Sequence, residues 1–157
     1  MMTRELCDLE IQIDESDCYL LDNYSWRLSW TSLKKGLSYF ESWRIIDGKK
    51  FRYLHRIIAD AKPGQIVDHI NGDTLDNRRS NLRLCTTAEN NRNTRGKNPK
   101  SGFKGVYPQF GTNTWQAKIT VAGKVLCLGT FKEKEDAAKC YDLAAREHFG
   151  EFARTNF

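Results

Sequence analysis

Apolar and polar residues alternate with a period of two along several short segments of the first 60 residues, which predicts half-buried β-strands. A turn at Asp47-Gly48 predicts a hairpin between the last two of these strands. Two short helices are expected over residues 15–23 and 55–61, the second ending before Pro63-Gly64. The predicted strands are residues 10–14, 26–30, 38–45 and 50–54.

The pattern changes between residues 65 and 93, where short apolar runs flank a loop rich in Asn, Asp and Gly. Residues 65–69 and 81–85 are predicted strands, and residues 70–80 form the loop between them. Thr86 or Thr87 is expected to cap a helix that follows at once. The sequence therefore predicts a compact ββα unit.

The last third of the chain alternates again and then changes to a helical period. Strands are predicted over residues 103–107, 114–121 and 124–131, and a helix over residues 133–149. A basic, polar linker over residues 94–101 separates this part from the ββα unit. Small and aromatic residues share one face of the helix and are expected to back the sheet: Ala137, Ala138, Tyr141, Ala144, Ala145 and His148.

Composition limits the class of protein. With 157 residues, 39% of them hydrophobic, the chain can form one ordinary domain or two small ones with folded cores. No apolar run approaches the roughly 20 residues of a membrane helix, and the first residues lack a secretory pattern, so we expect a cytoplasmic protein without a membrane partner. The five cysteines form no C-x-x-C pair, which predicts reduced thiols and no zinc site.

Charge is distributed unevenly along the chain. The net charge is +5, yet residues 1–22 hold seven carboxylates and one Arg, whereas residues 78–104 hold eight basic residues and one Glu. A solvated surface could carry such a block, but contact with the phosphates of a nucleic acid is the favoured interpretation. The residues expected to make this contact are Arg78, Arg79, Arg83, Arg92, Arg95, Lys97 and Lys104.

The ββα unit carries a candidate catalytic centre. Asp68 offers a carboxylate oxygen, and Asn90 offers an amide oxygen from the following helix. These ligands suit a divalent metal that keeps several waters, Mg²⁺ first and Mn²⁺ as an alternative. His69 adjoins them and can accept a proton from an attacking water near neutral pH.

The central sequence resembles the HNH endonucleases, in the branch whose last His is an Asn. The matching stretches are Leu54-His-Arg56, Val67-Asp-His-Ile-Asn-Gly-Asp73, Leu75-Asp-Asn-Arg-Arg-Ser-Asn-Leu-Arg83 and Thr87-Ala-Glu-Asn90. The resemblance implies that His69 is the general base, that Asp68 and Asn90 bind the metal, and that Asn81 ties the loop and orients His69. It also implies phosphate contacts from Arg78, Arg79 and Arg83.

Single elements of this pattern also have structural explanations. Asn-Gly-Asp is ordinary turn chemistry, and an EF-hand is excluded because position twelve from Asp68 is Arg79 instead of Glu. His55 could assist the site, but a hydrogen-bonded core histidine is favoured. Zinc-stapled relatives use paired cysteines that are absent here, so the N-terminal strands are expected to hold the unit together.

Residues 102–157 resemble the APETALA2/ethylene-response-factor DNA-binding domain. The matching stretches are Gly102-Phe-Lys-Gly-Val106, Trp115-Gln-Ala-Lys-Ile119, Leu128-Gly-Thr-Phe131, Glu135-Asp-Ala-Ala-Lys-Cys-Tyr-Asp-Leu-Ala-Ala145 and Asn156-Phe157. That family places a three-stranded sheet in the major groove, which implies that the outward side chains of the sheet face DNA. Core packing is the open alternative for Trp115. The expected DNA-facing residues are Lys104, Tyr107, Gln109, Trp115, Lys118 and Thr120. Tyr107, Gln109 and Cys127 depart from the plant pattern, so the plant target does not transfer.

Taken together, the sequence predicts an α+β protein. A ββα-metal (His-Me finger) nuclease core over residues 65–93, with N-terminal antiparallel strands, forms an HNH endonuclease domain over residues 1–93. A linker over 94–101 leads to a three-stranded antiparallel sheet with one helix over 102–157. The resemblances imply a phage or prophage homing endonuclease that nicks double-stranded DNA as a monomer or weak dimer. The alternatives are a non-catalytic DNA-binding regulator and, with less support, an RNA-directed protein.

Overall fold

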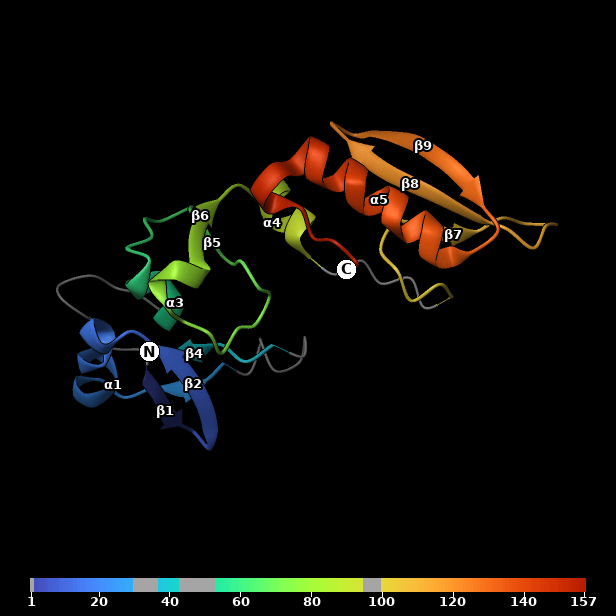
Figure 1. Cartoon of the computed structure of the whole chain (residues 1–157). Helices are drawn as coiled ribbons and strands as arrows, with labels where there is room; N and C mark the ends of the chain where they lie inside the picture. Colours follow the sequence, from blue (N-terminus) through green and yellow to red (C-terminus); the bar gives the residue numbers. More distant parts are fainter. Residues whose placement is uncertain (1, 30–36, 43–52, 95–99) are drawn as a thin grey trace. The chain divides into compact units, whose positions relative to one another are not determined.

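A computed structural model describes residues 2–29, 37–42, 53–94 and 100–157. The chain divides into two compact units, Met1–Asn90 and Asn91–Phe157, which are described separately below (Figure 1). Among the described residues, no helix has both the length and the apolar character needed to cross a membrane.

The first unit begins with a β-hairpin. Strands β1 (Met2–Leu6) and β2 (Leu9–Ile13) pair antiparallel across Cys7 and Asp8, which adopt the left-handed φ values of 52° and 60°. The sequence predicts the second strand but misses β1, because the β1 side chains are mostly exposed and the turn contains no glycine.

Short elements follow and enclose a small core. They are the 3₁₀ turn η1 (Glu15–Asp17), α1 (Tyr19–Asn23), the paired strands β3 (Arg27–Leu28) and β4 (Phe40–Glu41), and α3 (Leu54–Ile58). These elements confirm the predicted types but are shorter than predicted; the expected hairpin at Asp47-Gly48 lies outside the described residues. The side chains that form the core are Ile11, Ile13, Cys18, Leu20, Phe40, Leu54 and Ile58.

The predicted strand, loop, strand and helix are present in that order. Strands β5 (Ile66–His69) and β6 (Leu82–Cys85) pair antiparallel, with the 3₁₀ turn η2 (Arg79–Asn81) just before β6 and helix α4 (Thr87–Asn93) just after it. Thr86 caps α4: its hydroxyl accepts from the Glu89 N–H at 3.3 Å, and its own N–H donates to the Glu89 carboxylate at 2.8 Å. This reciprocal pair is a capping box, and it places the cap expected at Thr86 or Thr87 on Thr86.

Strand β2 holds the loop between β5 and β6. The Gln12 N–H donates to the Leu75 carbonyl at 3.0 Å, and the Asn77 N–H donates to the Gln12 carbonyl at 2.8 Å. A carboxylate oxygen of Asp14 accepts the Arg79 N–H at 2.9 Å. The N-terminal hairpin thus stabilises the ββα unit, as the absence of paired cysteines predicts.

The second unit is a three-stranded antiparallel sheet backed by one helix. Strands β7 (Val106–Pro108), β8 (Trp115–Val121) and β9 (Lys124–Phe131) lie in that order, and α5 (Lys134–Phe149) packs along them before the 3₁₀ turn η3 (Gly150–Phe152) (Figure 1). The predicted helix stripe is confirmed except at His148, which is exposed. The fully buried residues at this interface are Val106, Ala117, Ile119, Ala137, Ala138, Tyr141 and Ala145.

One glycine is required by close packing between sheet and helix. Gly105 has a φ of 73°, and a Cβ placed there would lie 2.0 Å from the Tyr141 ring. Gly123, in the β8–β9 turn, has a similar φ of 78° but nothing within 4 Å of an added Cβ. The Tyr141 ring of α5 therefore packs directly against Gly105, where no side chain can be accommodated.

Candidate functional site

Asp68 and His69 are successive residues at the end of β5. Both are buried, with 6% and 4% of their surface exposed. In the β5–β6 ladder Asp68 stands opposite Arg83, and His69 stands opposite Leu82. Because side chains alternate along a strand, Asp68 and His69 leave β5 in different directions and meet different neighbours.

The carboxylate of Asp68 is paired with Arg83. The Nε and one terminal nitrogen of Arg83 donate to Asp68 Oδ2 at 3.0 and 2.8 Å. The two side chains are only 10% and 7% exposed. In this structure the Arg83 guanidinium is bound to the proposed metal ligand, and the phosphate contact expected of Arg83 stays a prediction.

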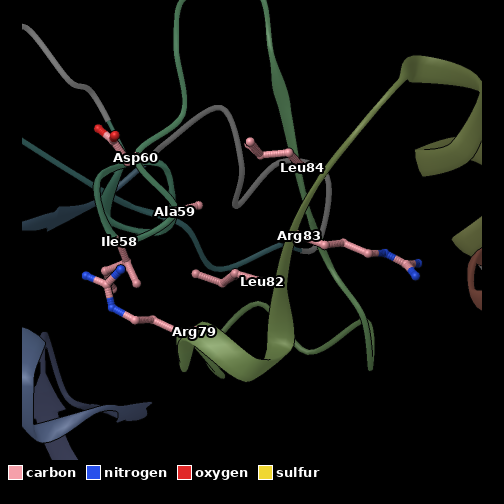
Figure 2. Close-up of a pocket in the computed structure, with 7 residues that line it drawn as sticks. All are labelled: Ile58, Ala59, Asp60, Arg79, Leu82, Arg83 and Leu84. Atoms are coloured by element: carbon pink, nitrogen blue, oxygen red, sulfur yellow. The ribbon is translucent and has the colours of Figure 1, made fainter.

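A small open pocket of about 190 Å³ lies on the other side of β6 (Figure 2). Leu82 and Leu84 point toward α3 in this view, whereas the Arg83 side chain extends from the opposite side of the strand. The pocket is partly apolar and contains neither Asp68 nor His69. We therefore place the candidate chemistry on the Asp68 side of the strand.

Asn81 ties the loop between the strands. Its Oδ1 accepts the Asn71 N–H at 3.0 Å, and its Nδ2 donates to the Asn71 side chain at 3.0 Å and to the Asp76 carbonyl at 2.8 Å. Asp76 is itself 1% exposed, and its hydrogen bonds from Arg78 hold the pKa of the carboxyl below its usual value. These contacts fix the loop across its base.

Asn77 lies beside His69, whereas the contacts of Asn81 described above are to Asn71 and Asp76, so the orienting role expected for Asn81 stays a prediction. The Asn77 side chain forms a hydrogen bond with the His69 imidazole. The Nε2 atom of His69 is buried within the described part of the chain. The sequence contained Asn77 in the matching motif but gave no sign of which Asn faces the histidine.

His69 lies in an aromatic cluster that keeps it uncharged. The centroid of its ring lies 6.0 Å from that of Tyr39, in a stacked arrangement, and 5.3 Å from that of His55, in an edge-on arrangement. The ring centroids of Tyr39 and His55 are 4.8 Å apart. Burial lowers the pKa of His69 below 6.5, despite opposing effects from the Asn77 hydrogen bond and from Asp68. Burial and the neighbouring His69 lower the pKa of His55 to about 3. Both rings are neutral at physiological pH, as a general base requires.

Cys85 lies near the two residues that are expected to bind metal. These are Asp68 on β5 and Asn90 on α4. Burial and then the nearby Asp68 carboxylate raise the pKa of the Cys85 thiol, and a backbone hydrogen bond from Asn90 opposes this effect. The Asn90 N–H also donates to the Thr86 carbonyl at 3.0 Å. Sequence reasoning did not single out Cys85.

The donor set fits a hard divalent cation. One carboxylate and one amide oxygen suit Mg²⁺ or Mn²⁺, which keep several waters. Asp68 already balances a cationic group, Arg83, at this position. In the described residues no three His, Cys, Asp or Glu side chains converge as a metal-binding group.

Two further arginines of the basic block are paired with carboxylates. Arg78 donates to Asp76 at 2.7 and 2.6 Å, and Arg79 donates to Asp17 at 2.8 and 2.6 Å. The acidic N-terminal segment therefore neutralises part of the block within the unit, which the charge pattern alone did not predict. The expected contacts of Arg95 and Lys97 lie outside the described residues.

The outward face of the second unit's sheet carries several of the expected reading residues. Tyr107 is 46% exposed, and the Lys118 ammonium lies 6.0 Å from its ring centroid. Thr120 is exposed, and Gln109 is exposed in the loop after β7. Gln116, which sequence reasoning missed, alternates with buried Ala117 and bonds to Cys127 at 3.1 Å.

Two of the expected reading residues face elsewhere. Trp115 packs against the core beside Phe103 and Phe131, on the same side of β8 as Ala117. The Lys104 ammonium donates to the carbonyls of Arg92 and Thr94, and burial lowers its pKa to about 8. The Arg92 guanidinium lies over the Phe149 ring at 4.9 Å. Trp115 therefore takes the core position that the sequence left open, and the Lys104 ammonium is held by backbone carbonyls in this structure.

Comparison with known proteins agrees with this geometry. Residues 52–92, which include β5, β6 and most of α4, match the model of the HNH endonuclease family. An uncharacterized HNH endonuclease of Acanthamoeba polyphaga mimivirus is 34% identical over 139 residues, covering 87% of this chain and 69% of the viral protein. The chain belongs to the HNH endonuclease family.

A C-terminal part of the HNH protein matches plant regulators. An AP2/ERF and B3 domain-containing transcription repressor of Arabidopsis thaliana is 46% identical over 61 residues, or 39% of this chain and 17% of the repressor. An AP2-like ethylene-responsive transcription factor from the same plant is 48% identical over 59 residues, or 36% of this chain and 11% of the factor. The likeness is restricted to this domain, and it supports a DNA-binding role for it.

Proposed function

We propose that this HNH protein is a metal-dependent endonuclease that hydrolyses a phosphodiester bond in double-stranded DNA. The observation that carries the proposal is the pair at the end of β5: a buried carboxylate, Asp68, followed by a buried neutral histidine, His69. Family membership adds the reaction class. The AP2-like domain adds the duplex as substrate.

Each residue of the pair has a different task. His69, uncharged at neutral pH, accepts a proton from the water that attacks the phosphorus. Asp68 and Asn90 would hold the divalent cation. When bound, such a cation neutralises phosphate charge and stabilises the leaving 3′-oxygen. Asn81 keeps the loop closed so that these groups stay in register.

The second unit is proposed to read the duplex with the outward face of its sheet. Lys118 supplies a positive charge, and Gln109, Gln116 and Thr120 supply hydrogen-bonding groups for base edges or phosphates. Tyr107 adds an exposed ring. One catalytic pair cuts one strand, so the protein is proposed to nick as a monomer or weak dimer, in the manner of viral homing endonucleases.

Nicking of a supercoiled plasmid tests this function. The full chain is incubated with Mg²⁺ or Mn²⁺, with EDTA, and as the variants His69→Ala and His148→Ala. Nicking by the wild type and by His148→Ala, and loss of nicking with EDTA or with His69→Ala, is the expected result. His148 is exposed on α5 and serves as the matched control. A duplex that is bound but never cut, across a broad pool of target sequences, would support a non-catalytic regulator.

A further inference from the structure

The strand register places seven side chains together on the outward face of the second unit's sheet. Residues that stand opposite each other in an antiparallel pair share a face. Ala117 and Ile119 of β8 lie on the other face and are buried against α5. The outward surface, called the reading face below, consists of Tyr107 on β7, Gln116, Lys118 and Thr120 on β8, and Val125, Cys127 and Thr130 on β9.

The reading face suits a polyanion but lacks the groups that usually recognise a G·C pair. Lys118 is its only charged member, so the face is positive. In the major groove a guanine is most often read by the guanidinium of Arg, and the amino group of cytosine is read by a carboxylate. None of the seven positions holds an Arg, an Asp or a Glu. The face instead offers an amide, hydroxyls, a thiol and apolar groups.

The charge of Lys118 lies toward one edge of the sheet. Its ammonium is 6.0 Å from the centroid of the Tyr107 ring, and Tyr107 belongs to β7, an edge strand. A lysine is a point charge that can meet either a phosphate or a guanine. Because the ammonium leans away from the middle of the face, it suits a phosphate better than a base edge. The base edges are then left to the uncharged side chains.

Gln116 is held across the middle of the reading face by Cys127. Its Nε2 donates to the Cys127 Sγ at 3.1 Å. This bond uses one N–H of the amide and leaves a second N–H beside the Oε1 acceptor. Adenine presents the complementary pair in the major groove, an N7 acceptor beside an N6 donor. Guanine presents two acceptors there, so one of them would face Oε1 without a hydrogen bond.

Val125 and Thr120 form an apolar place on the same face. Val125 is 65% exposed and stands directly opposite Thr120, which is also exposed. Both side chains end in methyl groups. The C5 methyl of thymine is the apolar group of the major groove, and contact with apolar side chains is how it is read. Cytosine carries no methyl group at this position and would leave Val125 in contact with water.

We propose that the reading face selects A·T base pairs. Gln116, held by Cys127, pairs with an adenine, and Val125 with Thr120 contacts the methyl group of a thymine. The inference deepens the proposed function and rests on its DNA-reading part. It names the class of duplex that the second unit brings to the nuclease centre.

Selection from a random pool of duplexes, followed by single-base replacements, tests this specificity. The full chain is used with EDTA, so that binding is measured without cleavage, and the strongest preferences should fall on A·T pairs. In the selected duplex, 7-deazaadenine removes only the N7 acceptor and should weaken binding about tenfold. Uracil in place of thymine removes only the methyl group and should weaken binding about fourfold.

Two results with the wild-type chain overturn the proposal. One is a selected sequence in which G·C pairs carry the preference. The other is an A·T preference that survives both replacements, because the protein would then read the shape of the duplex instead of its base edges. Neither result depends on a variant that has to fold.

Variants of the reading face assign the two contacts to their side chains. Gln116→Ala should become insensitive to 7-deazaadenine but keep the uracil penalty, and Val125→Ala should show the reverse. Leu143→Ala removes an apolar side chain that is 67% exposed on α5, and this matched control should keep both penalties. A Gln116→Ala variant that still loses tenfold with 7-deazaadenine overturns the assignment of adenine to Gln116.

The outcome is independent of the nuclease centre. A chain that selects A·T-dependent duplexes but never nicks them with Mg²⁺ or Mn²⁺ would refute the nuclease function and retain this specificity. A chain that nicks DNA but selects G·C pairs would refute the specificity alone.

Discussion

Removing Arg83 should destabilise the first unit in a way that a divalent cation reverses. Arg83→Gln leaves the Asp68 carboxylate, 7% exposed, without the guanidinium that now donates to it twice. Breaking a buried pair by deleting one partner costs about 3–5 kcal/mol, because the remaining charge is uncompensated. Asp68→Asn combined with Arg83→Gln leaves no charge and should cost clearly less than Arg83→Gln alone.

Urea unfolding followed by tryptophan fluorescence measures this effect. Three of the four tryptophans, Trp26, Trp30 and Trp43, belong to the first unit, so the signal reports mainly on it. Mg²⁺ at about 100 times its Kd should raise the free energy of unfolding of Arg83→Gln by roughly 2.7 kcal/mol, because the cation binds only the folded form. Lys62→Gln, at an exposed position of the same unit, serves as control and should change little.

Two results would refute this reasoning. An Arg83→Gln variant as stable as the wild type would mean that the pair contributes nothing at Asp68. A variant that is destabilised but not restored by Mg²⁺ or Mn²⁺ would mean that Asp68 does not hold the cation. The double variant guards against a general packing defect, because it changes the same volume without leaving a charge.

Three further predictions concern pH, packing and DNA binding. The pKa of His55 is about 3 in the folded protein and 6.5 in the unfolded chain. Between these pH values the unfolded chain binds one more proton than the folded protein. The free energy of unfolding therefore decreases as the pH falls below 6.5. The loss is up to about 1.4 kcal/mol per pH unit, and His55→Phe should flatten it in urea titrations at pH 7.5 and 5; an unchanged slope would contradict the assignment. Gly105→Ala should destabilise the second unit by about 3 kcal/mol or more, through strain at positive φ and overlap with Tyr141, whereas Gly123→Ala should cost about 1 kcal/mol. Equal melting temperatures of these two variants would refute the packing argument. On a duplex selected by the full chain, Lys118→Gln should reduce the slope of log affinity against log salt concentration by about one. Lys104→Gln should leave this slope unchanged, because its ammonium is bound to backbone carbonyls. A change of slope with Lys104→Gln would place that ammonium on the DNA.

Most of the element order follows from the sequence because the elements have strong local signals. The β9 strand, the capping box at Thr86 and the α5 stripe depend on alternation, on capping chemistry and on a helical period, all of which are local. Strand β1 was not predicted because its outward side chains are polar and its turn uses Cys7 and Asp8 at positive φ. A local pattern gives no indication of a non-glycine turn of this kind.

Site residues were predictable by type but not by partner. The motif named Asp68, His69, Asn81 and the arginines, whereas their contacts depend on residues far away in the chain. Asp17 meets Arg79 across 62 positions, and Gln12 bonds to Leu75 and Asn77. Lys104 and Trp115 show the same limit. The sequence alone does not distinguish a residue that faces DNA from one that packs inside the unit, because the strand register and the end of α4 decide its contacts.

The pairing of the arginines changes how the basic block attracts DNA. Arg78, Arg79 and Arg83 each face a carboxylate in the first unit, so their charge is balanced before any duplex arrives. For Arg83 a phosphate would have to compete with Asp68 inside a buried pair, and a charge in such a pair gains little from the exchange. Arg79, whose side chain is 58% exposed, can share its guanidinium most easily, whereas Arg83 at 10% cannot without opening the site. We therefore expect Lys118, on the outward face of the second unit's sheet, to contribute more to the salt-dependent part of DNA binding than Arg83 does.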